Sequence, residues 1–170
     1  LTDPSYSGQL MVLTYPLVGN YGVPPCTFEA NGLATFMESE KIHAEAIIVS
    51  DYSFEYSHWN AVESLGSWLK DEKVAGIYGI DTRELTKLLR EKGSMKGKIV
   101  FDAADEIDFV DPNLINQVDI VSCKEVITYG NGSKKVVLVD CGVKHNIIRC
   151  LLKRDVTVIR VPWNYDFTNM

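Results

Sequence analysis

The segment KKVVLVDCGVKHNIIRCLLKRDVTVIRVPW, residues 134–163, limits the possible folds more than any other part of the sequence. Residues 136–139 and 156–161 are runs rich in Val, Ile and Leu, typical of strands that are covered on both faces. Apolar residues recur at helical spacing between these runs, at Ile147, Ile148, Leu151 and Leu152. Two strands joined by a helix predict a parallel strand–helix–strand unit. Because one such unit cannot cover its own sheet, we expect it to begin a larger doubly wound α/β domain.

The preceding residues alternate between strand and helix patterns, which also indicates an α/β protein. Short apolar runs predict strands at residues 9–16, 44–52, 75–80 and 97–101 and, before a linker at residues 128–134, a last short strand. Helical spacing predicts two helices, at residues 30–42 and 58–73. We expect Pro16 to end the first strand and Ser57 to cap the second helix.

The helix with the strongest sequence signals is expected at residues 81–93, DTRELTKLLREKG. Asp81 can accept a hydrogen bond from the first-turn backbone, and Glu84 follows three residues later, as in a capping box. Gly93 can adopt the left-handed conformation that ends a helix.

Composition excludes several classes of function. Seventeen basic and 23 acidic residues give a net charge of −6, which argues against a nucleic-acid backbone as partner. No apolar run approaches the ~20 residues that a membrane span needs. The four cysteines form no Cys-x-x-Cys pair, so we expect no metal site and reduced thiols. The chain opens with LTDPSYSGQ, without a signal peptide or Met, so we expect a piece of a longer protein.

Cys141 is the first candidate for chemistry, because it follows a predicted strand and precedes a predicted helix. His145, four residues later, could act as its base. Asp140 on the other side would raise the thiol pKa, and the small flanking residues of a nucleophile elbow are missing. We therefore expect Cys141 to be a packing residue, with a small thiol hydrolase as the alternative.

The second candidate is the opening turn. Asp3-Pro4-Ser5 favours a rigid turn in which the Ser5 hydroxyl can donate and accept a hydrogen bond. Composition alone does not separate a ligand contact from an ordinary turn.

Four stretches together resemble the small chain of the glutamine-dependent carbamoyl-phosphate synthase family, most closely its eukaryotic fused members. They are LTDPSYSGQ, TYPLVGNYGVPP, GIDTRELTKLLREKGSMKGKI and VVLVDCGVKHNIIR, and their order and spacing also match. The resemblance implies a swivelling β/β/α domain that docks on the synthetase region, here incomplete at residues 1–128. It also implies that residues 135–170 are the truncated start of a flavodoxin-like class I glutamine amidotransferase domain.

The resemblance further implies an activity. Members hydrolyse glutamine with a Cys-His-Glu triad and pass ammonia to the synthetase region, which makes carbamoyl phosphate from bicarbonate and ATP. Ser5 matches a family position that contacts glutamine. The resemblance places the three triad residues beyond Met170, so no catalytic residue and no cofactor is expected here. ATP and magnesium would belong to the synthetase region, and glutamine and that region would be the partners, without nucleic acid or membrane.

Several alternatives stay open. The intact protein would be a cytoplasmic ligase of pyrimidine or arginine biosynthesis. If it is instead an ammonia-dependent, urea-type member in mitochondria, this region would be only structural. A non-catalytic docking module is the other alternative.

Overall fold

The computed structural model describes residues 1–102 and 106–168. They form two compact units, and neither unit is continuous in sequence. The first unit comprises Leu1–Ser7, Pro24–His43 and Gln117–Met170, and the second comprises Gly8–Val23 and Ala44–Asn116. The domain boundary expected between residues 128 and 135 stays a prediction.

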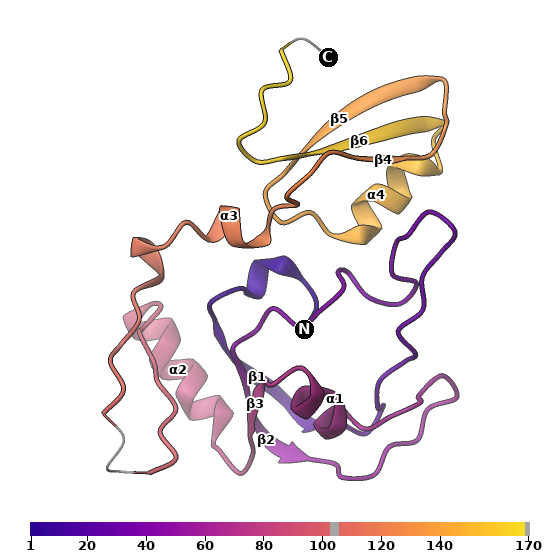
Figure 1. The fold of residues 1–170 in the computed structure, drawn as a ribbon. Helices are drawn as coiled ribbons and strands as arrows, with labels where there is room; N and C mark the ends of the chain where they lie inside the picture. Colours follow the sequence, from indigo (N-terminus) through magenta and orange to yellow (C-terminus); the bar gives the residue numbers. More distant parts are fainter. Residues whose placement is uncertain (103–105, 169–170) are drawn as a thin grey trace. The chain divides into compact units, whose positions relative to one another are not determined.

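The second unit contains a three-stranded parallel sheet with the order β1-β2-β3 (Figure 1). Its strands are β1 (Leu10–Val18), β2 (Ala46–Tyr52) and β3 (Ala75–Ile77). Its helices are α1 (Leu65–Asp71), α2 (Thr82–Lys92) and the 3-10 turn η2 (Pro112–Leu114). Helix α1 packs against β3, and α2 packs against β1 and β2. The buried side chains of β2, among them Ile47 and Val49, form the centre of this unit.

Helix α2 has the capping predicted from sequence. The Asp81 carboxylate accepts a hydrogen bond from the Glu84 N–H at 2.9 Å. Gly93 ends the helix with a φ of 81°, which a residue with a side chain rarely adopts. Both predicted end signals of this helix are therefore confirmed.

The first unit contains a mixed sheet with the order β4-β6-β5. Its elements are η1 (Pro4–Tyr6), α3 (Gln117–Val121), β4 (Ile127–Tyr129), β5 (Lys134–Asp140), α4 (His145–Leu152) and β6 (Val156–Pro162). Strands β5 and β6 are parallel, β4 is antiparallel to β6, and α4 packs against this sheet (Figure 1). The predicted strand–helix–strand unit and the α/β class are thus confirmed.

The core of the first unit lies between α4 and the sheet. Leu33, Ile148 and Val158 are fully buried there, and Tyr129 and Val143 are nearly so. Leu33 reaches this core from the segment 24–43, which explains why that segment belongs to the first unit.

Residues 30–42 do not form the predicted helix. Asn31 makes a local turn by accepting the Leu33 N–H at 3.0 Å, and Glu29 donates its N–H to the Leu33 carbonyl. The segment then runs as a series of bends whose backbone groups are hydrogen-bonded to Thr2, His145 and Arg149. Hydrogen bonds to these distant residues take the place of the backbone hydrogen bonds that a helix would have supplied.

Three further expectations for the second unit are wrong. Strand β1 continues past Pro16, because β1 is an edge strand and its register with β2 shifts between Leu13 and Leu17. Helix α1 is capped by Ser64, not Ser57, and the Ser64 hydroxyl accepts the Ser67 N–H at 3.1 Å. Residues 97–101 form no strand.

Among the residues that the structure describes, no helix has the length and apolarity needed to cross a bilayer.

Candidate functional site at the carboxyl end of β5

The turn from β5 into α4 is built around the carboxylate of Asp140, the last residue of β5. Asp140 is fully buried. Its Oδ1 accepts hydrogen bonds from the Gly142 N–H at 2.9 Å and the Val143 N–H at 2.8 Å. Gly142 has a φ of 96°, a conformation that favours glycine. The carboxylate thus fixes the sharp bend that follows the strand.

The second oxygen of Asp140 joins three parts of the first unit. Oδ2 accepts the Cys123 N–H at 2.7 Å and two donors of Arg160 on β6, Nε at 2.7 Å and Nη2 at 2.6 Å. Burial raises the pKa of the Asp140 carboxyl, but its backbone hydrogen bonds and Arg160 outweigh this and hold the pKa below its ordinary value. An ionised carboxylate with five bound donors is a structural group and not a proton donor.

Cys141 and His145 are not arranged as a nucleophile and base. Cys141 is exposed, so the expectation that it packs in the core is wrong. His145 is 1% exposed, and both ring nitrogens have other partners. Its Nδ1 accepts the Ala34 N–H at 3.0 Å, and its Nε2 lies 3.3 Å from Oε1 of Glu40. Because Nδ1 accepts, the imidazole proton lies on Nε2 and points to Glu40.

Glu40 is the charged partner of this imidazole. The hydrogen bond from His145 lowers the pKa of the Glu40 carboxyl to about 2, against the opposing effect of burial. The pair therefore consists of a carboxylate and a positioned imidazole, and both hold residues 34–40 against α4.

The opening turn of the chain has the predicted geometry. Asp3 precedes η1, and its Oδ1 accepts the Ser5 N–H at 3.0 Å. Pro4 is buried, and Ser5 is exposed at the surface of the turn. Asp3 holds Ser5 through hydrogen bonds from both its backbone N–H and its side chain, and the residue lies at the surface.

The opening turn lies next to the turn after β5. The other Asp3 oxygen, Oδ2, pairs with Nζ of Lys144 at 3.2 Å. A Cβ built on Gly142 would lie 3.2 Å from Cβ of Pro4, so the two backbones approach closely. Burial raises the pKa of the Asp3 carboxyl, but the bonds from Ser5 and Lys144 outweigh this and lower it. Ser5 therefore lies near the carboxyl end of a parallel strand, where open α/β sheets bind ligands.

Residues 38 and 39 hold both turns together, a role that sequence reasoning missed. The Glu38 N–H donates to Oγ1 of Thr2 at 3.0 Å, and Ser39 Oγ donates to the Thr2 carbonyl at 2.7 Å. The Glu38 carbonyl accepts the His145 N–H at 2.9 Å. Glu38 Oε2 accepts the Asn146 N–H, also at 2.9 Å. The only sequence signal for this role was that the segment is rich in Glu and Ser.

Across residues 1–102 and 106–168, no three or more His, Cys, Asp or Glu side chains gather in a way that could hold a metal ion.

Comparison with known proteins assigns the family. The family described as carbamoyl-phosphate synthase small chain, CPSase domain, matches residues 1–99, more than half of the chain. The chain belongs to the carbamoyl-phosphate synthase small-chain family. The resemblance noted from LTDPSYSGQ and the other three stretches is thereby confirmed.

Curated relatives of the carbamoyl-phosphate synthase small chain match over nearly the whole chain. Carbamoyl-phosphate synthase [ammonia], mitochondrial, of Homo sapiens is 51% identical over 172 residues, which cover 100% of this chain and 11% of that protein. Multifunctional protein pyr1-3 of Dictyostelium discoideum is 48% identical, over 98% of this chain and 8% of that protein.

A separate small chain also matches. The carbamoyl phosphate synthase arginine-specific small chain of Eremothecium gossypii is 50% identical, over 98% of this chain and 43% of that protein. The chain thus spans less than half the length of each of these three relatives.

Proposed function

We propose that this chain is part of a carbamoyl-phosphate synthase, a ligase whose small-chain region hydrolyses glutamine to glutamate and ammonia. The ammonia would be used with bicarbonate and ATP to form carbamoyl phosphate. The observation that carries the proposal is the match of the family's small-chain domain to residues 1–99, together with similarity to curated members over the whole chain.

The position of Ser5 supports a contact with glutamine. Its hydroxyl is presented by a turn that Asp3 and Lys144 hold at the carboxyl end of β5. A hydroxyl can both donate to and accept from the polar groups of glutamine, whose amide and α-amino groups need partners of both kinds.

We further propose that the glutamine-cleaving triad lies outside these residues, beyond Met170. The support is the arrangement around Cys141, whose sequence neighbour His145 is buried and bound to Ala34 and Glu40. In this proposal, residues 1–128 belong to the domain that docks on the synthetase region, and residues 135–170 begin the amidotransferase domain.

Partners and cofactors follow from the same assignment. Glutamine would be the substrate of the small-chain region, and the synthetase region would be its protein partner. ATP and magnesium would bind the synthetase region and not these residues. The intact enzyme would serve pyrimidine or arginine biosynthesis in the cytoplasm.

A separate observation supports a second candidate function. Relatives from human, rat and mouse, each 51% identical to this chain, are named carbamoyl-phosphate synthase [ammonia], mitochondrial. In an ammonia-dependent member located in mitochondria, this region would be structural and Ser5 would contact no glutamine.

One experiment separates the two candidates. The full-length protein that contains this chain would be assayed for carbamoyl phosphate with glutamine or with ammonium chloride as the nitrogen donor. The proposal expects formation with both donors and release of glutamate from glutamine. Formation with ammonium alone would establish the second candidate, and formation with neither would reject both.

A further inference from the structure

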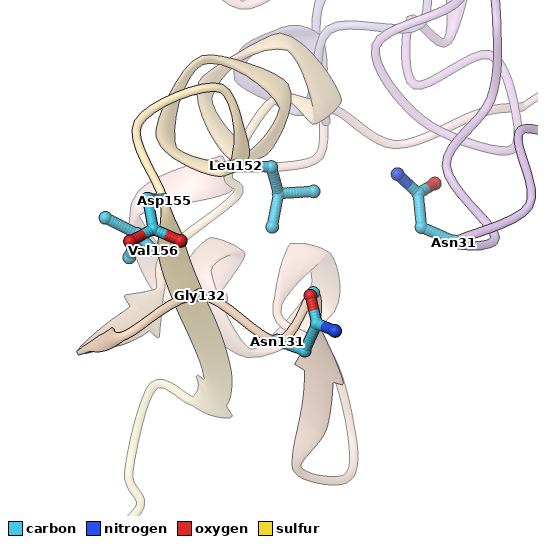
Figure 2. Close-up of a pocket in the computed structure, with 7 residues that line it drawn as sticks. Asn31, Asn131, Gly132, Leu152, Asp155 and Val156 are labelled. Atoms are coloured by element: carbon cyan, nitrogen blue, oxygen red, sulfur yellow. The ribbon is translucent and has the colours of Figure 1, made fainter.

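The chain contains two Asn-Gly pairs, Asn31-Gly32 and Asn131-Gly132. Both asparagines line one pocket of about 160 Å³ within the first unit (Figure 2). In such a pair, the backbone nitrogen of the glycine can attack the asparagine side chain, because glycine has no Cβ to block the approach. Asparagine is correspondingly one of the thermally labile residues. The structure gives the two pairs very different surroundings.

Asn31 is held away from this reaction. Its Oδ1 accepts the Leu33 N–H at 3.0 Å, and its Nδ2 donates to Oε2 of Glu29 at 3.2 Å. The attacking atom is also bound, because the Gly32 N–H donates to the Glu29 carbonyl at 2.9 Å. Attack would require all three hydrogen bonds to break or rearrange.

Asn131 has none of these restraints. It is exposed, and among the described residues no hydrogen bond is made by its carboxamide or by the Gly132 N–H. The Gly132 carbonyl accepts from Thr157 Oγ1 at 2.9 Å, on the far side of the residue from the attacking nitrogen. The next anchor is Ser133, whose Oγ donates to Asp155 at 2.6 Å. The pair is thus held at the Gly132 carbonyl and at Ser133, whereas the two groups that react, the Asn131 carboxamide and the Gly132 N–H, are not held.

We propose that Asn131 is a site of spontaneous deamidation and that Asn31 is protected from it. The Gly132 backbone nitrogen forms a bond to Cγ of Asn131 while the Cγ–Nδ2 bond breaks. The proton of the Gly132 N–H goes to solvent base, and Nδ2 takes one proton from solvent and leaves as ammonia. Water then opens the five-membered imide at either carbonyl, which gives aspartate or isoaspartate at position 131. No oxidant, metal or enzyme takes part.

The product would alter the loop between β4 and β5. Either product places a carboxylate in the pocket that Asp155 also lines. Isoaspartate also adds a methylene to the backbone beside Gly132. The longer backbone would displace Gly132, which packs tightly on Asp155, since a Cβ on Gly132 would lie 2.3 Å from the Asp155 carbonyl carbon. We expect the hydrogen bonds between Ser133 and Asp155 to weaken, with faster amide exchange at the start of β5.

The test is to incubate the full-length protein that contains this chain at mildly alkaline pH and to analyse its peptides by mass spectrometry and isoaspartyl methyltransferase labelling. The peptide with Asn131 should gain the mass of an NH2-to-OH exchange at least about tenfold faster than the peptide with Asn31, since the hydrogen bonds at Asn31 must break first. Asn131→Gln should abolish the main product, and the matched Asn31→Gln should leave it unchanged.

Incubation in urea tests whether the fold is the cause. There, the two asparagines should react at similar rates, because the protection of Asn31 is lost. Equal rates in the folded protein, faster reaction at Asn31, or an unchanged ratio in urea would each overturn the proposal. Substitution of Gly132 is unsuitable as a control, because any Cβ would collide with the Asp155 backbone.

Discussion

The carboxylate of Asp140 and the guanidinium of Arg160 form a buried ion pair, with Oδ2 2.6 Å from Nη2. Asp140 ends β5 and Arg160 lies on β6, so the pair joins the two parallel strands at their carboxyl ends. The same Asp140 oxygen accepts the Cys123 N–H. This one carboxylate therefore connects β5, β6 and the segment that precedes β4.

Asp140→Asn should lower the free energy of unfolding by about 3 kcal/mol, the size expected when one partner of a buried pair is removed. The asparagine side chain keeps the shape of the aspartate. Its NH2 group is itself a donor, however, and it would face the donors of Arg160 or Cys123. Urea unfolding of the variant measures the loss. The matched control is Lys87→Met, which breaks the exposed pair with Glu84 and should cost far less.

The double variant Asp140→Asn with Arg160→Met should be more stable than the sum of the two single losses predicts. Asp140→Asn alone leaves the buried guanidinium without its anion, and Arg160→Met alone leaves the buried carboxylate without its cation, whereas the double variant has neither unpaired charge. A double-mutant cycle from urea unfolding measures the coupling. Strictly additive losses would show that the two side chains do not act as a pair.

Stability should fall in acid partly through Asp140. Because its pKa in the folded protein is below the ordinary value, its contribution is complete above the unfolded pKa of about 4 and is lost as the pH falls through the folded pKa. Unfolding free energies measured between neutral pH and about pH 3 should therefore decline more steeply in the wild type than in Asp140→Asn. Parallel pH curves would contradict this assignment.

Ser5→Ala tests the proposed glutamine contact in the full-length enzyme. Loss of one hydrogen bond should raise the KM for glutamine by about three- to tenfold. The rate with ammonium is the internal reference. The ratio of the glutamine-dependent rate to the ammonium-dependent rate should fall in the variant. The matched control is Ser67→Ala, an exposed serine on α1. Equal loss of both rates would indicate a folding defect instead, and an unchanged KM would reject the contact.

Alkylation tests the role of Cys141. Cys26, Cys141 and Cys150 are exposed, and His145 is bound elsewhere, so the three thiols should react with iodoacetamide at rates within about threefold of one another. Cys123 should react more slowly, because burial and the Asp140 charge raise the pKa of its thiol. Peptide mass spectrometry gives the four rates. Reaction of Cys141 about tenfold faster than Cys26 would reveal an activating group.

The elements that could be predicted from sequence are those with local causes. The strand–helix–strand unit from β5 to β6 follows from its own apolar runs, and α2 follows from Asp81 and Gly93 at its ends. Residues 30–42 could not be predicted, because their conformation depends on His145 and Arg149, more than a hundred residues away.

The candidate site shows the same limit. Sequence predicted a rigid turn at Asp3-Pro4-Ser5, and the structure contains it. Its location beside the turn after β5 depends on the pair between Asp3 and Lys144, which no local pattern encodes. Sequence also missed that Cys141 is exposed; it lies in the turn that the hydrogen bonds of Asp140 hold, and no local pattern encodes these bonds.

The interleaving of the two units sets an order for biosynthesis. The second unit ends at Asn116, so all of its residues are translated before β4, β5 and β6 exist. Residues 1–7 and 24–43 are made early but have to wait for partners from the last third of the chain. In the nascent chain, Leu33 and its neighbours are therefore exposed until their core partners have been synthesised. These are the residues that a ribosome-associated chaperone would bind.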